Sequence, residues 1–305
     1  MGGSQDQGVE FSNQSKVLFP RAGITKGDLI RYYRRIAPLV LPYWRDRPLS
    51  QHRFPDGIAR PGFFQKEIPA HFPDWIERAS LRARTDGTVT YVLANNEATL
   101  VYLANQACIT PHLGLSRIDR VDHPDWLVFD LDPSDEDFEK VRFAARAVHA
   151  LLGRLELESF VQTSGSRGLH VFVPLDRTAD FEQVRAFARA VARHLANRHP
   201  DRLTTEQRKR KRGDRVYLDI MRNGYGQTTV APYAVRAREG APVATPLEWA
   251  EVGDRRLHPQ RYTIANIFRR LAKKTDPWTN MADRAQSLDR ARERLSNLRS
   301  GQPAA

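Results

Sequence analysis

The segment Asp125-Trp126-Leu127-Val128-Phe129-Asp130-Leu131-Asp132-Pro133 decides the fold, because it is an apolar strand that ends in two carboxylates. Side chains two positions apart on a strand point to the same face, roughly 7 Å apart. Asp130 and Asp132 therefore repel each other unless a cation lies between them. A divalent metal such as Mg²⁺ or Mn²⁺ is the usual compensation. The alternative is a strand that simply runs into a polar turn at Asp132-Pro133-Ser134.

The residues that follow this strand form one ordered series of elements. Apolar spacing predicts strands and helices in the order β-α-β-β-α-β, at residues 126–132, 135–153, 160–163, 169–175, 180–197 and 215–220. This order is typical of a ferredoxin-like or RRM-like fold, in which the first and last strands are antiparallel neighbours. Asp219 on the last strand is therefore expected beside Asp130 and Asp132. Convergence of three acids from distant positions favours a metal site over a turn.

Other elements are predicted with less regular signals. Ser134 or Asp135 is expected to cap the helix at 135–153, and Gly153 to end it. Thr25 is expected to cap a helix with Leu29 on its apolar side. Further helices are expected at residues 97–108, 261–274 and 281–298, and further strands at residues 88–93 and 228–236.

These elements together predict an α+β protein. The ferredoxin-like catalytic core is expected to be fused to an N-terminal mixed α/β module within one composite domain. The expected parts are an N-terminal module at 1–120, the core with the acid triad at 121–240, and a helical segment packed on the core at 241–305. Within them, residues 1–15 begin as a loose polar arm, and residues 300–305 are expected to be frayed.

Composition restricts the function classes. The 305-residue chain has 48 Lys and Arg against 36 Asp and Glu, a net charge of +12. Acids clustered within a basic chain indicate a metal site that faces a polyanion, most commonly nucleic acid, whereas the alternative is a surplus that serves solubility. Cys108 is the only cysteine, which excludes a disulfide framework and a cysteine-based metal site. No long apolar run or signal core is present, so we expect a soluble intracellular protein without membrane contact.

A second polar segment, Thr163-Ser164-Gly165-Ser166-Arg167-Gly168-Leu169-His170, lies between two of the expected strands. Glycines let backbone N–H groups approach phosphate oxygens, and arginine adds bidentate recognition. The alternative is an ordinary hairpin turn. Asp130, Asp132 and Asp219 fit two-metal phosphoryl transfer but do not separate a polymerase from a nuclease. A triphosphate site in the same sheet favours a nucleotidyltransferase.

Further groups of residues are candidates for nucleic-acid contacts. The run Arg208-Lys209-Arg210-Lys211-Arg212 is expected to be a mobile loop on template or primer phosphates, or else only solvated. The segments Gln51-His52-Arg53-Phe54 and Gly62-Phe63-Phe64-Gln65-Lys66 interleave cations with aromatics, as a base-stacking platform does. Paired phenylalanines are more often core, so one of Phe63 and Phe64 is expected to contact a base.

Three isolated residues remain open on sequence alone. Lys16 and Lys26 lie in a polar region and either bind phosphate or are ordinary surface lysines. His112, after Pro111, is either a core histidine or a neighbour of the metals.

The motifs resemble those of the polymerase domain of bacterial ligase D, within the archaeo-eukaryotic primase superfamily. The resemblance rests on Leu127–Pro133, on Thr163–His170, and on Thr228-Thr229-Val230-Ala231-Pro232-Tyr233 with Arg236. It extends from Lys16-Val17-Leu18-Phe19-Pro20 to Pro246-Leu247-Glu248-Trp249. A DNA-directed nucleotidyltransferase is implied, one that fills gaps and extends ends in non-homologous end joining and favours ribonucleotides.

The resemblance also implies residue roles. Two divalent ions, Mn²⁺ or Mg²⁺, would be bound by Asp130, Asp132 and Asp219, with His112 beside them. The incoming triphosphate would be held by Ser164, Ser166, Arg167, Gly168 and His170, with His52, Arg53 and Arg236 near it. Phe64 would stack on the nucleotide base or a template base. Lys16 and Lys26 would grip the 5′-phosphate of the downstream strand.

The implied partners are DNA with gaps or double-strand breaks, nucleoside triphosphates, Ku and a DNA ligase, in the bacterial cytoplasm near the nucleoid. Two positions depart from the family pattern: Arg167 stands where lysine is frequent, and Gln227 where a basic residue is often found. With no ligase or phosphoesterase segment visible, the chain is either a stand-alone polymerase or one domain of a larger enzyme. A primase that makes RNA primers de novo, or an end-binding module without catalysis, are the alternatives.

Overall fold

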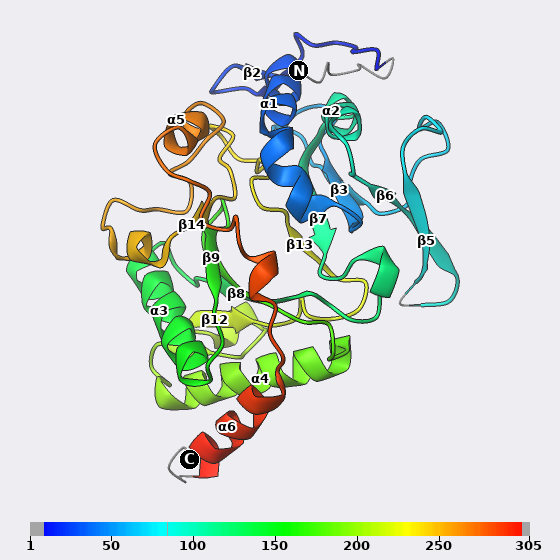
Figure 1. Cartoon of the computed structure of the whole chain (residues 1–305). Helices are drawn as coiled ribbons and strands as arrows, with labels where there is room; N and C mark the ends of the chain where they lie inside the picture. Colours follow the sequence, from blue (N-terminus) through cyan, green and yellow to red (C-terminus); the bar gives the residue numbers. More distant parts are fainter. Residues whose placement is uncertain (1–8, 84, 301–305) are drawn as a thin grey trace.

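The computed structural model describes residues 9–83 and 85–300, and it contains two sheets packed side by side with helices on their outer faces (Figure 1). The N-terminus lies at the end of the molecule that carries α1, and the C-terminal helix α6 lies at the opposite end. The expected loose arm and frayed end fall partly outside the described residues, at 1–8 and 301–305.

The first sheet has the strand order β13-β7-β3-β6-β5, and β4 pairs with β3. Helices α1 (Lys26–Trp44) and α2 (Glu97–Asn105) pack together beside it. A separate hairpin, β1 (Val17–Phe19) with β2 (Ile24–Thr25), precedes α1. The strands of the sheet are β3 (Pro48–Arg53), β4 (Phe63–Gln65), β5 (Arg78–Arg82), β6 (Thr88–Leu93), β7 (Cys108–Gly114) and β13 (Thr228–Val230).

The second sheet has the strand order β11-β12-β8-β10-β9-β14. Its four central strands are antiparallel, and the first and last of them in sequence, β8 and β12, are neighbours, as the β-α-β-β-α-β order predicts. The strands are β8 (Trp126–Asp132), β9 (Phe160–Thr163), β10 (Leu169–Pro174), β11 (Leu203–Thr204), β12 (Val216–Asp219) and β14 (Pro246–Leu247). The helices are α3 (Phe138–Arg154), α4 (Phe181–Arg198), α5 (Ile267–Leu271) and α6 (Asp289–Ser300).

Successive side chains of β8 point to opposite faces of the second sheet and enter two separate hydrophobic cores. Leu127, Phe129 and Leu131 point to one face of the second sheet and pack with residues of α3 and α4. Trp126 and Val128 point to the other face, into a core shared with the first sheet and α1. Because successive side chains alternate, Asp130 and Asp132 continue the face that looks toward the first sheet. The acids therefore lie at the edge of the inter-sheet core.

A buried ion pair joins the two sheets. Arg47, which precedes β3, is fully buried, and its two terminal nitrogens each donate to Asp125 at 2.6 Å. Its guanidinium also lies 3.6 Å above the ring of Trp126 at the start of β8. The bidentate pair and the cation–π contact hold the N-terminal ends of β3 and β8 close together.

Most of the predicted elements are confirmed, with shifts at their ends. The strands expected at 126–132 and 160–163 have those bounds. The helix expected at 135–153 begins later, because Asp137 rather than either predicted residue caps it, accepting from the Glu139 amide at 3.0 Å. Gly153 does not end this helix, which continues to Arg154.

Four further predictions are longer than the observed elements. The helix expected at 97–108 ends at Asn105, since Ala107 has φ 55° and Cys108 already begins β7. Only Thr228–Val230 of the strand expected at 228–236 is extended, and it joins the first sheet. Asn266 accepts a hydrogen bond from the Thr263 amide at 2.9 Å, so the expected helix at 261–274 is reduced to α5. Gln286 forms a β-bridge with Leu175, so the helix expected at 281–298 begins only at Asp289, as α6.

None of the helices within the described ranges is long and apolar enough to cross a membrane.

Asn223 completes the edge of β8 where β12 has ended. Its fully buried amide accepts from the Val128 N–H at 2.8 Å and donates to the Val128 carbonyl at 2.6 Å. A second donation, at 3.0 Å, reaches the Ile220 carbonyl. The side chain thus occupies the place of a strand residue and satisfies both backbone groups of Val128.

We predict that Asn223→Ala lowers the free energy of unfolding by about 2–4 kcal/mol, because two buried backbone groups lose their partner. Denaturant titration followed by circular dichroism measures the change. Asn280→Ala is the matched control, since that residue is exposed, and the loss there should be within about 0.5 kcal/mol. Equal stability of the two variants would show that the Asn223 amide does not hold the strand.

Candidate active site

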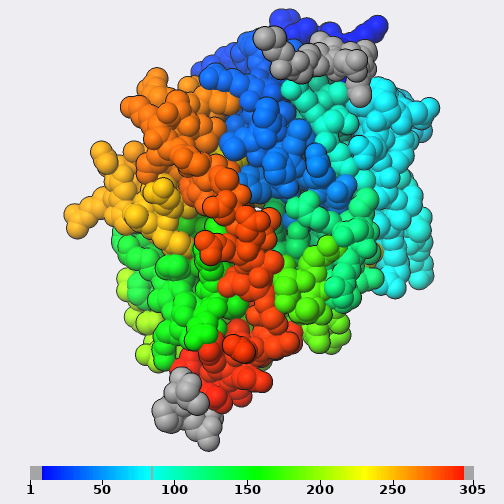
Figure 2. All heavy atoms as spheres, viewed as in Figure 1, coloured from blue at the N-terminus to red at the C-terminus, as the bar shows by residue number. Residues whose placement is uncertain are grey.

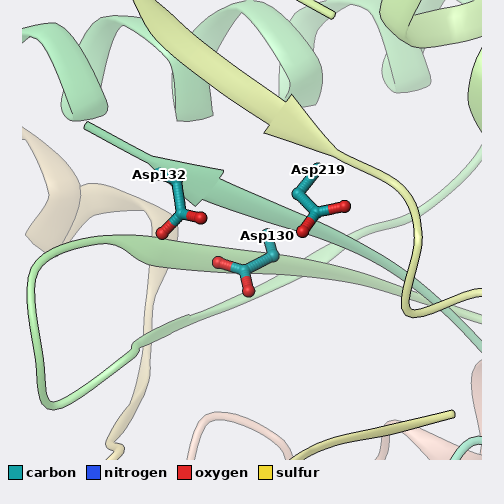
Figure 3. A group of neighbouring side chains, drawn as sticks. All are labelled: Asp130, Asp132 and Asp219. Carbon is teal, nitrogen blue, oxygen red and sulfur yellow. The ribbon is translucent and has the colours of Figure 1, made fainter. Parts of the chain in front are cut away.

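Three carboxylates meet at the ends of β8 and β12. The two strands pair antiparallel with Asp219 opposite Asp130, and Asp132 follows two residues later on the same face of β8. One carboxylate oxygen from each of the three lies within 4.8 Å of the others. Figure 3 shows the three side chains turned toward one another from two neighbouring strands. The topology therefore brings together the acids that the sequence predicted to converge.

The three acids differ in how their charge is compensated. Burial and the neighbouring charges of Asp130 and Asp219 raise the pKa of Asp132 to about 6. Burial and Asp130 also raise the pKa of Asp219, although the Met221 amide donates to it at 2.7 Å. Burial pushes the pKa of Asp130 upward, but His170 and nearby guanidiniums outweigh it and leave that pKa below its ordinary value. In the metal-free protein the ionised forms of Asp132 and Asp219 therefore lack the compensation that Asp130 receives.

His170 is held between Asp130 and a buried glutamine. The register of β10 on β8 places His170 opposite Asp130, and its Nε2 lies 3.2 Å from the carboxylate Oδ1. Its Nδ1 lies 3.3 Å from the amide nitrogen of Gln162, which stands opposite it on β9. The amide nitrogen can only donate, so this arrangement favours the tautomer with the proton on Nε2, pointed at Asp130.

The turn at 164–168 is closed by its own first residue. The Ser164 hydroxyl accepts from the amides of Ser166 at 3.2 Å and Gly168 at 3.0 Å. A Cβ on Gly168 would lie 2.1 Å from the Leu131 carbonyl, so only glycine fits against β8. Gly165 has φ +64°, in the region that favours glycine. The turn therefore has a fixed shape that lies against the acid-bearing strand.

A pocket of about 180 Å³ opens between the acids and this turn. Its polar lining combines two of the three acids with four arginines, namely Asp130, Asp132, Arg167, Arg222, Arg236 and Arg238. Burial lowers the pKa of Arg236 to about 10, so its guanidinium remains charged at neutral pH. Arg236 donates to the Ser164 carbonyl at 2.7 Å, and Arg238 donates to the Ser166 hydroxyl at 2.7 Å. The pocket thus has an acidic floor and a basic rim.

The first sheet places three aromatic rings beside this pocket, and of the three only His112 lines it directly. His52 on β3 and Phe64 on β4 stack with ring centroids 4.1 Å apart, and His112 meets Phe64 edge-on at 5.3 Å. Burial, helped by Arg236, lowers the pKa of His52 to about 4, and the same two causes lower that of His112 strongly. Both imidazoles are therefore neutral at pH 7. Phe64 is 60% exposed, so its outer face is free to receive a flat group.

Several candidate residues lie outside this pocket. Arg53 points to the opposite side of β3, where it donates to the Gln106 carbonyl at 2.9 Å and to Gln65 at 2.8 Å. Phe63, on the same side of β4 as Gln65, is exposed, with the Arg53 guanidinium 5.7 Å from its ring. Neither residue lines the pocket, so proximity to the nucleotide is not supported for Arg53.

Lys16 and Lys26 adjoin each other beside the N-terminus of α1. The Lys26 amide donates to the Lys16 carbonyl at 2.8 Å. Lys16 forms an ion pair with Asp56 at 2.9 Å, whereas the Lys26 ammonium is buried and donates to Ser12 and to the Asn105 carbonyl, both at 3.2 Å. Burial and Lys16 lower the pKa of Lys26, which makes an anion at this point favourable.

The basic run at 208–212 is more ordered than expected. Lys209–Lys211 form a 3₁₀ turn. Arg212 is buried, donates to the Glu206 and Gln207 carbonyls at 3.0 and 2.7 Å, and stacks 4.0 Å above Tyr217. Arg212 is thus a structural residue of this turn, while its three predecessors and Arg208 are exposed.

Sequence reasoning missed three residues of the site. Arg222 lies 3.8 Å from Asp130, Arg238 contacts the turn, and Gln162 contacts His170. The i, i+2 spacing of Arg236 and Arg238 was a possible signal. For Gln162 the only signal was a polar residue within an apolar strand.

A model of the LigD primase-polymerase domain family matches residues 25–278. The chain belongs to this family. Curated relatives include the multifunctional non-homologous end joining protein LigD of Mycolicibacterium smegmatis, 35% identical over 83% of this chain, and the bifunctional non-homologous end joining protein LigD of Bacillus subtilis, 30% identical over 88%. These matches span 34% and 43% of the relatives' own lengths, so the chain corresponds to less than half of either protein.

The family is also evident in three dimensions. The solved polymerase domain of Mycobacterium tuberculosis ligase D in complex with DNA matches with a TM-score of 0.86 and 33% identity, over 92% of this chain and 100% of that one. The α+β fold class and the resemblance seen in the motifs are therefore confirmed, and the chain is a nucleotidyltransferase of the polymerase class.

The residues present fit a divalent metal. Three carboxylates supply the hard oxygen ligands that Mg²⁺ and Mn²⁺ prefer, and the raised pKa of Asp132 reflects repulsion that a cation relieves. The buried Nε2 of His112, on the facing wall, has no hydrogen-bond partner among the described residues. The cluster can therefore hold a metal beside the pocket that Asp130 and Asp132 line.

We predict that Asp132→Asn stabilises the metal-free protein at pH 8. The pKa of Asp132 rises from 3.8 to about 6 on folding, so the ionised carboxylate destabilises the fold increasingly as pH rises through this range and fully above it. The gain should be about 1–2 kcal/mol, since a pKa change of one corresponds to about 1.4 kcal/mol and solvent screens part of the charge.

Thermal unfolding with a chelator present, at pH 5 and pH 8, measures this difference. Exposed Asp201→Asn is the control and should change little at either pH. Destabilisation by Asp132→Asn at pH 8 would contradict the repulsion argument.

Proposed function

We propose that this domain is a DNA-directed polymerase that fills gaps and extends ends at double-strand breaks by two-metal nucleotidyl transfer. The observation that carries the proposal is the acid triad beside a basic, turn-lined pocket in one sheet. A nuclease needs the acids but has no use for a triphosphate cradle. The DNA complex of the matched M. tuberculosis domain supports DNA as the substrate.

In the proposed mechanism the metal ligands lie on β8 and β12, and the phosphate contacts come from other segments of the chain. Asp130, Asp132 and Asp219 would hold two divalent ions, which when bound activate the primer 3′-hydroxyl and neutralise the leaving pyrophosphate. Arg236, charged and fixed on the Ser164 carbonyl, orients the phosphates from the pocket wall. The side chains at the mouth that add charge or hydrogen bonds are Ser166, Arg167 and Arg238.

His170 and the aromatic rings of the first sheet have distinct tasks in this proposal. His170 aims its Nε2 proton at Asp130 and fixes the orientation of that carboxylate, and it borders the phosphates on the same side. Phe64, backed by His52, offers its exposed ring to the nucleotide base or a template base. His112 lines the pocket from the first sheet, and Gly168 lines it where the turn packs against β8.

The finer assignments follow from the family resemblance. We propose Mn²⁺ or Mg²⁺ as the ions, a preference for ribonucleotides, and Ku with a DNA ligase as partners. The proposed location is the bacterial cytoplasm, in contact with the nucleoid. Residues Arg208, Lys209, Arg210 and Lys211 are proposed to contact DNA phosphates, and the divisions at residues 120 and 240 are proposed as the limits of the module and the core.

We predict that Asp130→Ala/Asp132→Ala abolishes nucleotide addition, a loss of at least about 10³-fold, while binding to gapped DNA persists. The assay is gap filling on 5′-phosphorylated DNA with ATP or dATP and with Mn²⁺ or Mg²⁺. Omission of the primer tests for a primase, since synthesis on bare template would favour that activity. Retained synthesis in the double variant would refute the mechanism.

We predict that Lys16→Ala/Lys26→Ala removes the preference for a 5′-phosphorylated gap over an unphosphorylated one. The charge of Lys16 contributes to the lowered pKa of Lys26, and a phosphate would relieve this repulsion. Because Lys26 also hydrogen-bonds the Asn105 carbonyl, the single Lys16→Ala variant separates charge from folding. Lys140→Ala on α3 is the control, and an unchanged preference in the Lys16 variants would assign both lysines to the ordinary surface.

A further inference from the structure

Two segments distant in sequence bring cations together outside the nucleotide pocket. Residues 251–274 form the walls of a second pocket of about 390 Å³, which is lined by six cationic side chains and two carboxylates. The cations are Arg256, Arg261, Arg269, Arg270, Lys273 and Lys274. Figure 2 shows this segment, yellow-orange to orange, lying against the blue surface of α1. We call the exposed cations of this region, with Arg35 of α1, the flank surface.

The carboxylates in this pocket are already shared. Asp254 pairs with Arg256 at 3.1 Å and with Arg261 at 3.4 Å. Glu251 pairs with Arg270 at 2.7 Å and with Lys274 at 3.4 Å. Each acid therefore serves two cations, and the pocket retains a surplus of positive charge.

Three exposed cations of the flank surface have no carboxylate within ion-pair distance among residues 9–83 and 85–300: Arg35, Arg269 and Lys273. The guanidinium of Arg35 lies flat, 3.8 Å above the ring of Phe268. Stacking uses the face of the guanidinium and leaves its N–H edge available for a bidentate contact. Concentrated, unpaired charge of one sign is costly unless a polyanion compensates it.

The flank surface lies beside the turn at 164–168 of the nucleotide pocket, and it shares helix α1 with Lys26. Gln260, at the rim of the segment, donates to the Ser166 carbonyl of the phosphate turn at 2.8 Å. Lys26 begins α1, and Arg35 lies nine residues further on, about 14 Å along the helix axis and, at 3.6 residues per turn, on the opposite side of the helix. A duplex that leaves the proposed 5′-phosphate site must therefore cross α1 to come to Arg35, and then to α5.

We propose that the flank surface binds the sugar–phosphate backbone of the duplex downstream of the gap. The proposal rests on the function proposed above, since it presumes a gapped DNA substrate. It adds a second anchor, distinct from the metal site and the 5′-phosphate lysines, that reads only backbone charge. The gain in DNA affinity from this anchor therefore depends on the length of the downstream duplex.

The test compares Arg269→Glu/Lys273→Glu with the wild-type domain. Binding is measured by fluorescence anisotropy to gapped DNA with the same gap and a downstream duplex of about 4, 8 or 16 base pairs, over a series of salt concentrations. Arg189→Glu/Arg193→Glu, on the exposed face of α4, is the matched control with an equal charge change. Arg269→Gln/Lys273→Gln separates loss of attraction from new repulsion.

Wild type and the α4 control should bind more tightly as the downstream duplex lengthens, and the α5 charge reversal should lose this gain. Loss of two phosphate contacts lowers the slope of log K against log salt by about 1.8 on the long substrate. The affinity gain of Arg269→Gln/Lys273→Gln with duplex length should lie between those of wild type and the charge-reversed α5 variant. Nucleotide addition on the shortest substrate should be unchanged in all four proteins.

Two results would overturn the flank assignment. One is a length dependence identical to wild type in the α5 variants. The other is a loss of affinity that does not depend on the flank surface. Equal loss on short and long substrates, or equal loss in the α4 control, would show this and would indicate general electrostatics. If no protein adds nucleotides to a gap, the proposed function itself fails, and the length series still reports on duplex binding.

Discussion

The register of β12 on β8 is the constraint on which the rest of the site depends. Backbone hydrogen bonding sets Asp219 opposite Asp130, and the pleat places Asp132 on the same face. With this register the three carboxylates lie within 4.8 Å of one another, and their mutual repulsion is a cost to the fold. The neighbouring features then follow as compensation: His170 on the next strand, Arg222 after β12 and Arg236 on the opposite wall.

The two sheets contribute different chemistry to one seam. The second sheet presents charge, because Asp130 and Asp132 continue the face of β8 that carries Trp126 and Val128 deeper in the core. The first sheet presents neutral rings, since burial holds the pKa values of His52 and His112 below their ordinary value. Under the proposed function, phosphates would lie at the charged side of the pocket and a base at the aromatic side.

Local pattern predicted the core well, and residues that depend on tertiary contacts less well. The strand at 126–132 was predicted with its bounds because its apolar run and its polar end are both encoded locally. The segment 228–236 has the same β-type composition, yet only three residues are strand, and Tyr233, with φ 62°, interrupts the extended backbone after them. The burial of Lys26 and Arg212, and the contact of Gln162 with His170, arise from neighbours far away in sequence that no local pattern reports.

Because of Asn223, strand β8 is unusually sensitive to a single substitution elsewhere in the chain. The ladder of a sheet is built from backbone groups that every residue type possesses, so a point substitution rarely removes one of its bonds. At Val128 the ladder is continued by a side chain instead, and the genetic code can delete it in one step. The strand that carries two of the three acids therefore depends on two separate parts of the sequence. One is its own run of apolar residues, and the other is a single side-chain amide 95 positions later in the chain.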